Sequence, residues 1–348
     1  MRAVVLEEGQ RVAVADVADA KLLGSSDVLI RVTLAAICGT DVHIKHGGIP
    51  GIEPGAILGH EFVGVVQEAG ADVRRFKVGD RIASPPALWC GKCPACQSST
   101  VQNCVEGSMY SGGPFMSPMG LDGVHTELVR APNADLCLTP IPASVPDEQA
   151  LLVIDMFSTG YHAAHEAHIK TGDAVVVSGC GPVGLCAVLA AWQHGPSRVF
   201  AVDMFDNRLA LAAKYGAIPI DIRQGDPVER ILEATGGEGV DVVLEASGTT
   251  QGFLSATRMI RRYGTVSCVG LFAQPVEFPV QELIYKGIKV VMGLGNLVHV
   301  PRLMKLVEYG RVDLTDIGTH TFALEDAVAA YDLFENHKDQ CLKVFLKP

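Results

Sequence analysis

The chain has 348 residues, of which 48% are hydrophobic and 19% are charged, and it includes 37 glycines. This composition is typical of a well-buried globular protein and excludes a disordered or fibrous chain. The formal net charge of -11 disfavours nucleic acid and anionic membranes as partners, because phosphate binding needs basic patches. We therefore expect a small-molecule substrate, no nucleic-acid partner and no membrane partner. A prior of roughly 150 residues per domain predicts two domains.

The sequence predicts a cytoplasmic protein. Its first residues, MRAVVLEEGQRVAV, alternate apolar and polar side chains like a strand and do not resemble a signal peptide. No segment approaches the roughly 20 consecutive apolar residues of a membrane span. Ten cysteines in such a chain indicate reduced thiols and metal ligands.

Residues 1 to about 150 are predicted to form a mainly β domain. Segments that alternate or run apolar are separated by Gly and Pro, as in RAVVLEE, DVLIRVTLAAIC, EFVGVVQEAG and DRIASPPA. From about residue 151 to 290, strand and helix patterns alternate, which predicts a parallel sheet with helices on both faces. One of these helices is predicted over TTQGFLSATRMIRRYG, residues 249–264.

After about residue 297 the chain is predicted to form two helices, in PRLMKLVEYG and LEDAVAAYDLFEN, and a closing strand, CLKVFLKP. So short a strand needs a sheet to join. We expect it to return to the N-terminal domain.

Four cysteines lie within fifteen residues, in the segment WCGKCPACQSSTVQNC. Their spacing lets four thiolates converge on one tetrahedral zinc and leaves no position open for a substrate, which predicts a structural site. The alternative is a disulfide pair or unrelated surface thiols, which a reducing compartment disfavours. The predicted ligands are Cys90, Cys93, Cys96 and Cys104.

A glycine-rich turn predicts a dinucleotide site. It follows the apolar strand VVVSG and precedes an apolar helix, so that backbone amides and the helix dipole can meet a pyrophosphate. Asp203 ends the next strand, about 20 residues further on, where a carboxylate binds the ribose hydroxyls and favours NAD over NADP. Arg208, one helical turn later, can reach the adenosine side of the cofactor, which keeps NADP as the alternative to NAD. The turn comprises Gly179, Cys180, Gly181, Pro182, Val183 and Gly184.

This turn has an alternative interpretation. Glycines of the same pattern also occur in doubly wound domains that bind no nucleotide. In that case Asp203 would act only as a helix cap.

A second metal site is indicated by residues at strand ends. Cys38 follows the strand IRVTLAAI and His60 follows the glycine turn ILG, and a catalytic zinc needs one more protein ligand while keeping a position for substrate. Taken singly, a cysteine before glycine and a histidine before a strand are each more often core residues than metal ligands. Asp155 lies in the apolar segment LLVIDMFSTGYHAA, where a carboxylate is costly unless it binds something.

Together these motifs resemble the zinc-containing medium-chain alcohol dehydrogenase family over essentially the whole chain. The resemblance rests on CGTDVH at 38–43, GHE at 59–61, the four-cysteine lobe, the STGY turn after Asp155 and GCGPVG at 179–184. It implies an α/β protein with a GroES-like catalytic domain over 1–153, a Rossmann NAD-binding domain over 154–296 and a C-terminal return over 297–348. It also implies two zinc ions per chain and a dimer or tetramer that pairs through the edge strand KVVMG.

The resemblance assigns roles to individual residues. Asp155 would be the third ligand of the catalytic zinc beside Cys38 and His60, as in bacterial secondary alcohol dehydrogenases. Glu61 would be either a fourth, exchangeable ligand or a carboxylate beside the ligands. Three histidines spaced along one segment receive no metal role from the resemblance: His162, His165 and His168.

The implied chemistry is the removal of hydride from a zinc-bound alkoxide to nicotinamide C4. Thr40 and His43 would relay the proton to solvent, and Asp41 would orient His60. Further residues would contact the cofactor: Thr159 the nicotinamide face, and Val269 and Leu294 the nicotinamide ribose.

We therefore expect NAD-dependent oxidation of an alcohol, a secondary alcohol or vicinal diol, to the ketone or aldehyde, and the reverse reduction. The alternative within enzymes is a polyol or amino-alcohol dehydrogenase, acting on a sorbitol-like or threonine-like substrate. A remote alternative is a non-catalytic zinc- and nucleotide-binding relative. Trp89, Tyr110 and Phe115 are expected to offer aromatic surface to a small hydrophobic substrate.

Overall fold

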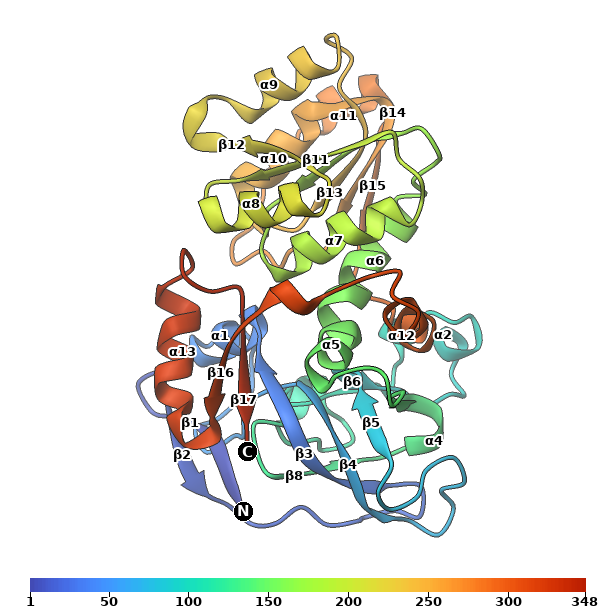
Figure 1. The fold of residues 1–348 in the computed structure, drawn as a ribbon, viewed down its shortest axis with the longest axis vertical. Helices are drawn as coiled ribbons and strands as arrows, with labels where there is room; N and C mark the ends of the chain where they lie inside the picture. Colours follow the sequence, from blue (N-terminus) through green and yellow to red (C-terminus); the bar gives the residue numbers. More distant parts are fainter. The chain divides into compact units, whose positions relative to one another are not determined.

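The computed structural model describes residues 1–348, except for the side chains of Pro114 and Phe115. Contacts divide the chain into two units, shown in Figure 1. The first unit comprises Met1–Asp155 and Asn296–Pro348, and the second comprises Met156–Gly295. The boundaries predicted from the sequence fall after residues 153 and 296.

The first unit is built on a seven-stranded sheet of order β16-β17-β3-β4-β5-β9, with β8 also paired to β3. The closing strand β17 runs antiparallel to β3, with Val344 opposite Ile37. Two small sheets, β1-β2 and β6-β7, accompany it. The strands are β1 (Arg2–Glu7), β2 (Arg11–Asp16), β3 (Val28–Ile37), β4 (Glu61–Ala69), β5 (Arg81–Ser84), β6 (Ala87–Leu88), β7 (Ser108–Met109), β8 (Leu128–Ala131), β9 (Thr139–Pro140), β16 (Gly318–Ala323) and β17 (Lys343–Lys347).

Short helices and turns connect these strands. Branched and aromatic side chains of β3 and β4, among them Ile30 and Phe62, fill the core of this unit because both faces of the strands are covered. The helices are α1 (Gly39–Lys45), α2 (Pro94–Gln97), α3 (Gly113–Met116), α4 (Ala134–Cys137), α5 (Asp147–Leu152), α12 (Val300–Glu308) and α13 (Ala327–Asn336), with 3-10 turns η1 (Val101–Asn103), η4 (Leu297–His299), η5 (Thr315–Ile317) and η6 (Leu324–Asp326).

The second unit is a doubly wound domain. Its six strands pair in the order β12-β11-β10-β13-β14-β15, and every pair is parallel. The strands are β10 (Ala174–Ser178), β11 (Arg198–Asp203), β12 (Ile218–Asp221), β13 (Val240–Glu245), β14 (Ile260–Cys268) and β15 (Lys289–Met292). The helices are α6 (Ser158–Glu166), α7 (Pro182–Trp192), α8 (Asp206–Lys214), α9 (Pro227–Ala234), α10 (Thr250–Met259) and α11 (Val280–Lys286), with the 3-10 turn η3 (Ile222–Gln224).

The order of the strands reverses between the neighbouring strands β10 and β13: β11 and β12 follow on one side, and β14 and β15 on the other. In open parallel sheets such a reversal opens a crevice at the carboxyl ends of the strands, where nucleotides bind. The glycine-rich turn 179–184 lies at that end of β10.

The helix predicted over residues 249–264 is wrong in its last turn. The helix α10 ends at Met259, and Ile260 begins β14 opposite Val240 of β13. Ile260 is buried in this pairing, and Arg261 forms an ion pair with Asp241 at 2.6 Å. Pairing with a neighbouring strand therefore overrides the local helical pattern.

Among the described helices, none combines the length and the apolar character needed to cross a membrane.

Close backbone packing explains two glycines of the turn after β10. Gly179 has a φ of +88°, which favours glycine. A Cβ on Gly184 would lie 1.8 Å from the carbonyl oxygen of Gly179, whereas a Cβ on Gly181 would meet only Arg208, at 4.0 Å. The third glycine thus serves the packing of α7 on the strand.

We predict that Gly184→Ala lowers the stability of the second unit by about 1–3 kcal/mol, because the added methyl group overpacks the turn. Thermal unfolding followed by circular dichroism measures the change. The matched control is Gly181→Ala, which should melt within a degree or so of the parent, since its methyl group meets open space. Equal melting of the two variants would contradict the packing argument.

Candidate metal centres and nucleotide site

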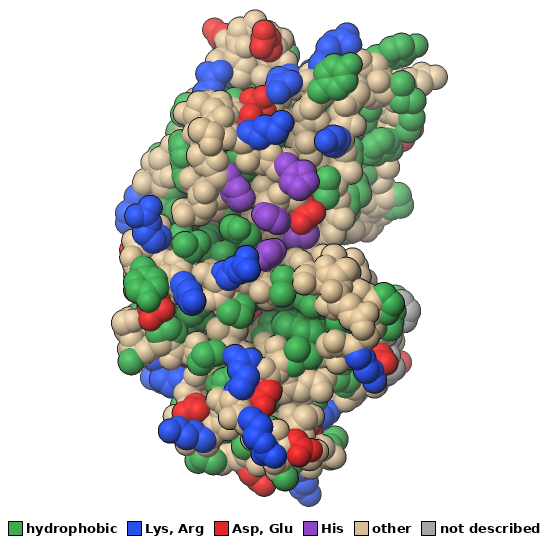
Figure 2. All heavy atoms as spheres, turned by 90° about the vertical axis from the view of Figure 1, so that its right-hand side faces the viewer, with side chains coloured by type: hydrophobic (Ala, Val, Ile, Leu, Met, Phe, Trp, Pro, Cys, Tyr) green, Lys and Arg blue, Asp and Glu red, His purple; other side chains and the backbone are tan. Residues whose placement is uncertain are grey.

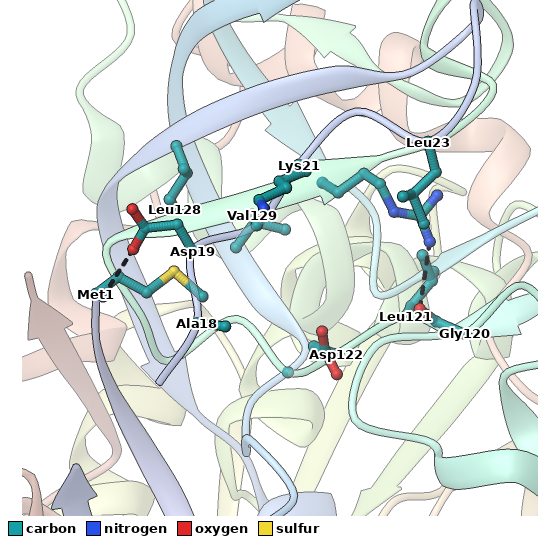
Figure 3. A pocket seen from close by; sticks show the side chains of 13 residues that line it. Met1, Ala18, Asp19, Lys21, Leu23, Gly120, Leu121, Asp122, Leu128 and Val129 are labelled. Carbon is teal, nitrogen blue, oxygen red and sulfur yellow. Dashed lines mark hydrogen bonds and ion pairs between the residues drawn. The ribbon is translucent and has the colours of Figure 1, made fainter. Parts of the chain in front are cut away.

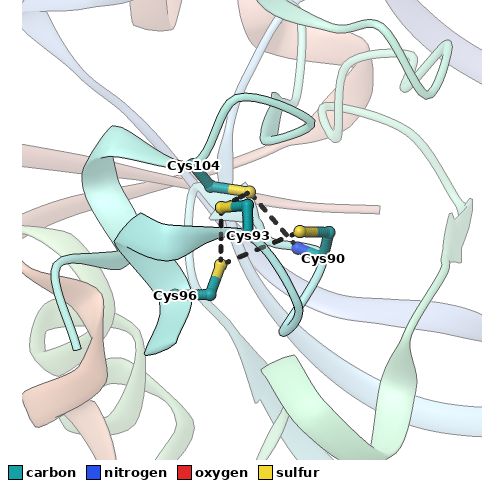
Figure 4. Close-up of side chains that lie close together, drawn as sticks. All are labelled: Cys90, Cys93, Cys96 and Cys104. Carbon is teal, nitrogen blue, oxygen red and sulfur yellow. Dashed lines mark hydrogen bonds between the residues drawn. The ribbon is translucent and has the colours of Figure 1, made fainter. Parts of the chain in front are cut away.

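The four cysteines of the lobe converge. Figure 4 shows their sulfur atoms turned toward one another. The Sγ–Sγ distances are 3.9 Å for Cys90–Cys96, 3.6 Å for Cys93–Cys96 and 3.8 Å for Cys93–Cys104. A tetrahedron with Zn–S bonds of about 2.3 Å has edges of about 3.8 Å, whereas a disulfide is about 2 Å long. All four cysteines are free, and their arrangement fits a zinc ion.

The surroundings of these sulfurs differ. Hydrogen bonds from the backbone of Cys96 and Val105 lower the pKa of the Cys93 thiol to about 6. Loss of contact with water raises the pKa of the Cys96 thiol to about 12. These pKa values favour a thiolate at Cys93 and a thiol at Cys96, and a structural zinc would bind all four as thiolates.

A second cluster joins Cys38, His60, Glu61 and Asp155 in the first unit. One ligand atom of each lies within 4.8 Å of the others. The Nε2 atom of His60 is 3.4 Å from an oxygen of Asp155 and 3.7 Å from Oε1 of Glu61. The donor set of sulfur, imidazole and carboxylate suits a catalytic zinc.

Strand pairing explains how distant residues meet here. Strands β3 and β4 are antiparallel, with Ala36 opposite Glu61, so that Cys38 just after β3 lies near His60 just before β4. Asp155 comes from a π-helical turn, Val153–Phe157, between α5 and α6. Such turns are rare and occur frequently at functional sites.

Asp41 fixes the orientation of His60. One carboxylate oxygen is 3.0 Å from Nδ1 of His60, and the other accepts a hydrogen bond of 2.8 Å from the backbone N–H of Cys38. If Nδ1 carries the proton toward Asp41, the lone pair of Nε2 points at the other ligands. Burial lowers the pKa of His60, but the charge of Asp41 and hydrogen bonds raise it well above its usual value. The site therefore favours a cation.

Sequence reasoning missed two residues that lie beside this cluster. Lys343 of β17 reaches Glu61, with Nζ 2.8 Å from Oε1 and 2.7 Å from Oε2. His125 packs over the backbone before His60, where a Cβ on Gly59 would lie 2.2 Å from its ring. In the sequence, the only sign of Lys343 is that a charged residue interrupts the apolar pattern of the closing strand, between Leu342 and Val344.

The ion pair of Glu61 and Lys343 is fully buried. Burial raises the pKa of Glu61 to about 7, against the opposing charge of Lys343. Burial alone would lower the pKa of Lys343, but the charge of Glu61 holds it above its usual value. The charge of each residue thus favours the charged form of the other.

The residues expected to relay a proton lie on α1. The hydroxyl of Thr40 is 3.8 Å from the sulfur of Cys38. His43 is half-buried and follows one turn later on the same helix.

Asp203 lies at the end of β11, against the glycine turn. It accepts a hydrogen bond of 2.7 Å from the backbone N–H of Cys180, and two more from Met204 and Phe205 at 2.7 and 3.0 Å. The guanidinium of Arg208 is 3.9 Å from this carboxylate and lies 4.6 Å from the centre of the Phe205 ring. Pro182 and Val183 begin α7, as a helix N-terminus facing a phosphate requires.

The remaining predicted cofactor residues lie at the ends of neighbouring elements. Thr159 is in the first turn of α6 and packs against Gly295, where a Cβ would lie 2.7 Å from its hydroxyl. Val269 follows β14 and donates its N–H to the carbonyl of Glu245 at 2.9 Å. Leu294 follows β15 and is exposed.

Two family models match the chain. The model for the alcohol dehydrogenase GroES-like domain covers residues 24–143, and the model for zinc-binding dehydrogenases covers residues 182–308. An alcohol dehydrogenase of Cupriavidus necator is 35% identical, over 100% of this chain and 99% of its own. A sorbitol dehydrogenase of Bacillus subtilis is 33% identical, over 94% and 91%. The solved structure of the alcohol dehydrogenase TADH from Thermus sp. ATN1 is 38% identical with a TM-score of 0.94, over 100% and 99%.

This chain belongs to the zinc-containing alcohol dehydrogenase family. It is an oxidoreductase that acts on a small-molecule alcohol with zinc and a nicotinamide cofactor. The fold class predicted from the sequence, a GroES-like domain with a Rossmann domain, is confirmed.

Two of the aromatic residues expected to offer surface to a substrate are instead buried in this dehydrogenase. Tyr110 is fully buried, with its ring edge-on to Phe62 at 5.5 Å and its hydroxyl 3.2 Å from Ser84. Trp89 is also buried. Both belong to the core because their large apolar area is worth more there. The side chain of Phe115 lies outside the described residues.

Histidine side chains, purple in Figure 2, gather on one face of the dehydrogenase. In the second unit His165 stacks on Tyr161 at 5.7 Å, and His194 lies 6.2 Å from His165. His168 follows α6 with a φ of +52°. Among the described residues, only the two clusters above bring three or more ligand atoms within metal-binding distance, and His165, His168 and His194 belong to neither.

A cavity of about 350 Å³ in the first unit is shown in Figure 3. Its lining includes Met1, Asp19, Lys21, Leu121 and Arg130. None of the predicted site residues lines it.

We predict that Asp41→Asn weakens zinc binding at the second cluster by about 10–100-fold, because His60 loses the anion that orients it. Competition with a chromophoric chelator measures the affinity. Asp27→Asn is the matched control: Asp27 is equally buried and bonds Arg130 and two backbone N–H groups, but lies outside the cluster. Loss of zinc affinity in both variants alike would refute a specific role for Asp41.

Proposed function

We propose that this dehydrogenase oxidises a secondary alcohol or vicinal diol to the ketone or aldehyde with NAD, and catalyses the reverse reduction. The observation that carries the proposal is the convergence of Cys38, His60 and Asp155, of which His60 is buried, with the buried Glu61 beside them. An aspartate as third ligand favours secondary alcohols and diols as substrates, by resemblance to bacterial members of the family.

In this proposal each residue has a defined task. Cys38, His60 and Asp155 would hold the zinc, which acts as a Lewis acid and lowers the pKa of an alcohol oxygen. The cofactor supplies the hydride acceptor at nicotinamide C4. The Thr40 hydroxyl would take up the hydroxyl proton of the alcohol while its own proton passes on to His43, which would release it toward solvent. Asp41 keeps His60 in the ligating tautomer.

The proposed cofactor is NAD. The carboxylate of Asp203 is held by backbone N–H groups, so it is in place before a ribose arrives. It can accept hydrogen bonds from ribose hydroxyls and repels a 2′-phosphate. Arg208 lies near this carboxylate, which partly offsets that repulsion. Thr159, Val269 and Leu294 are the proposed contacts of the nicotinamide and its ribose.

The protein is proposed to hold two zinc ions per chain, one at each cluster, and to work in the cytoplasm as a dimer or tetramer. Large apolar side chains are exposed on β15 and α11 of the second unit: Ile284, Tyr285 and Met292. A surface of this kind supports pairing of two copies through the edge strand β15.

The central test is Cys38→Ser. We expect alcohol-dependent NADH formation to fall more than about 100-fold and zinc content to fall from about two to about one per chain, because a thiolate ligand is lost. NAD binding, followed by fluorescence quenching, should persist.

The control for this test is Cys186→Ala, a buried cysteine outside both clusters, which should keep both zinc ions and full activity. A panel of primary and secondary alcohols, diols, sorbitol and threonine identifies the substrate class. Full turnover by the serine variant would defeat the proposal, and a clear preference for sorbitol or threonine would move it to that substrate.

For the cofactor, Asp203→Asn should reduce the preference for NAD over NADP by about tenfold or more, since the carboxylate charge is lost while the amide oxygen still accepts the hydrogen bonds from Met204 and Phe205. The ratio of kcat/KM values for the two cofactors measures this. Asp226→Asn, which changes the cap of α9, should leave the ratio unchanged. An NADP preference in the unmodified protein would contradict the proposal at once.

A further inference from the structure

The buried ion pair of Lys343 and Glu61 lies directly beside the metal ligands. Neither residue has exposed surface. The pairing of β17 with β3, and of β3 with β4, brings the start of the last strand next to Glu61. The last strand of the chain therefore delivers a positive charge to the catalytic cluster.

The ammonium group engages the same oxygen that a metal would use. Oε1 of Glu61 is 3.7 Å from Nε2 of His60, the nitrogen that faces the other ligands. The same atom accepts the hydrogen bond from Lys343 at 2.8 Å. Oε2 lies 2.7 Å from Nζ but has no hydrogen-bond partner. Lys343 and a metal ion thus compete for one carboxylate.

Charge balance decides this competition. The thiolate of Cys38 and the carboxylate of Asp155 already neutralise a divalent ion, so Glu61 is a third negative charge in a buried site. A buried charge without a partner is strongly unfavourable. With Lys343 present Glu61 has its partner, whereas without Lys343 only the metal can neutralise it.

We propose that Lys343 is a positioning residue that holds Glu61 off the catalytic metal and so keeps one coordination position open for the alcohol. This inference rests on the proposed function, because it needs the metal at Cys38, His60 and Asp155. Glu61 of the GHE motif is then not a metal ligand while it is paired with Lys343.

The test uses the full-length protein with cobalt in place of zinc. The visible spectrum of each protein, minus that of its Cys38→Ser counterpart, isolates the catalytic site from the four-cysteine lobe. Imidazole is the probe, because it binds to a metal only where a position is open. In the unmodified protein, imidazole should shift the cobalt bands with a saturable isotherm.

Lys343→Met should weaken imidazole binding by about tenfold or more, because Glu61 then occupies the open position. Lys343→Met combined with Glu61→Gln should restore it, since a neutral amide does not need the metal. Lys343→Arg should behave like the parent. Unchanged imidazole binding in Lys343→Met would overturn the proposal, as would a loss that the double variant fails to restore.

The double variant decides the matter if Lys343→Met alone does not fold, because it leaves no buried charge without a partner. The proposal predicts that its cobalt spectrum matches that of the parent, because Glu61 is not a ligand in the parent. A changed spectrum would overturn it. A parent protein without any Cys38-dependent cobalt band would instead refute the proposed function, so the two failures are distinguishable.

Discussion

The site depends on a concentration of negative charge that only a cation can stabilise. Cys38, Glu61 and Asp155 bring a thiol and two carboxyl groups within 4.8 Å of His60 Nε2 and of one another. Their mutual repulsion would be severe in a place that water scarcely reaches. Lys343 balances one of these charges and a divalent metal balances the other two. The metal and the lysine together therefore bring this cluster close to electrical neutrality.

Most of the site could be predicted because its motifs are local. CGTDVH, GHE, the cysteine lobe and the glycine turn each lie on a few consecutive residues, so that spacing alone indicates their chemistry. Lys343 could not be found in this way, because 282 residues separate it from Glu61 and no spacing rule links them. His125 was missed for the same reason, since its role depends on how closely its ring approaches Gly59. Strand pairing, which a single sequence does not determine, brings Lys343 into place. Backbone hydrogen bonds with Leu58 and Val4 hold His125.

The errors in the fold have related physical causes. The segment MIRRYG continues the pattern of α10, yet Ile260 pairs with Val240 because a parallel sheet gains more from burying a branched side chain than a helix does from one further turn. Trp89 directly precedes the cysteine lobe and Tyr110 follows it, and both are expected from the sequence to offer aromatic surface to a substrate. Both are instead packed inside, because aromatic rings carry the largest area to be removed from water.

The sequence alone does not determine whether Glu61 coordinates the metal. A glutamate directly after a metal-binding histidine begins a strand, and its side chain can meet either the metal or whatever lies on the neighbouring strand. Which contact wins depends on the charge opposite, and here that charge comes from the far end of the chain. An apolar residue at that position would leave the carboxylate only the metal to neutralise it. The coordination of a metal by one residue can thus be controlled by another that never touches the metal, and the control is visible only once the strands are paired.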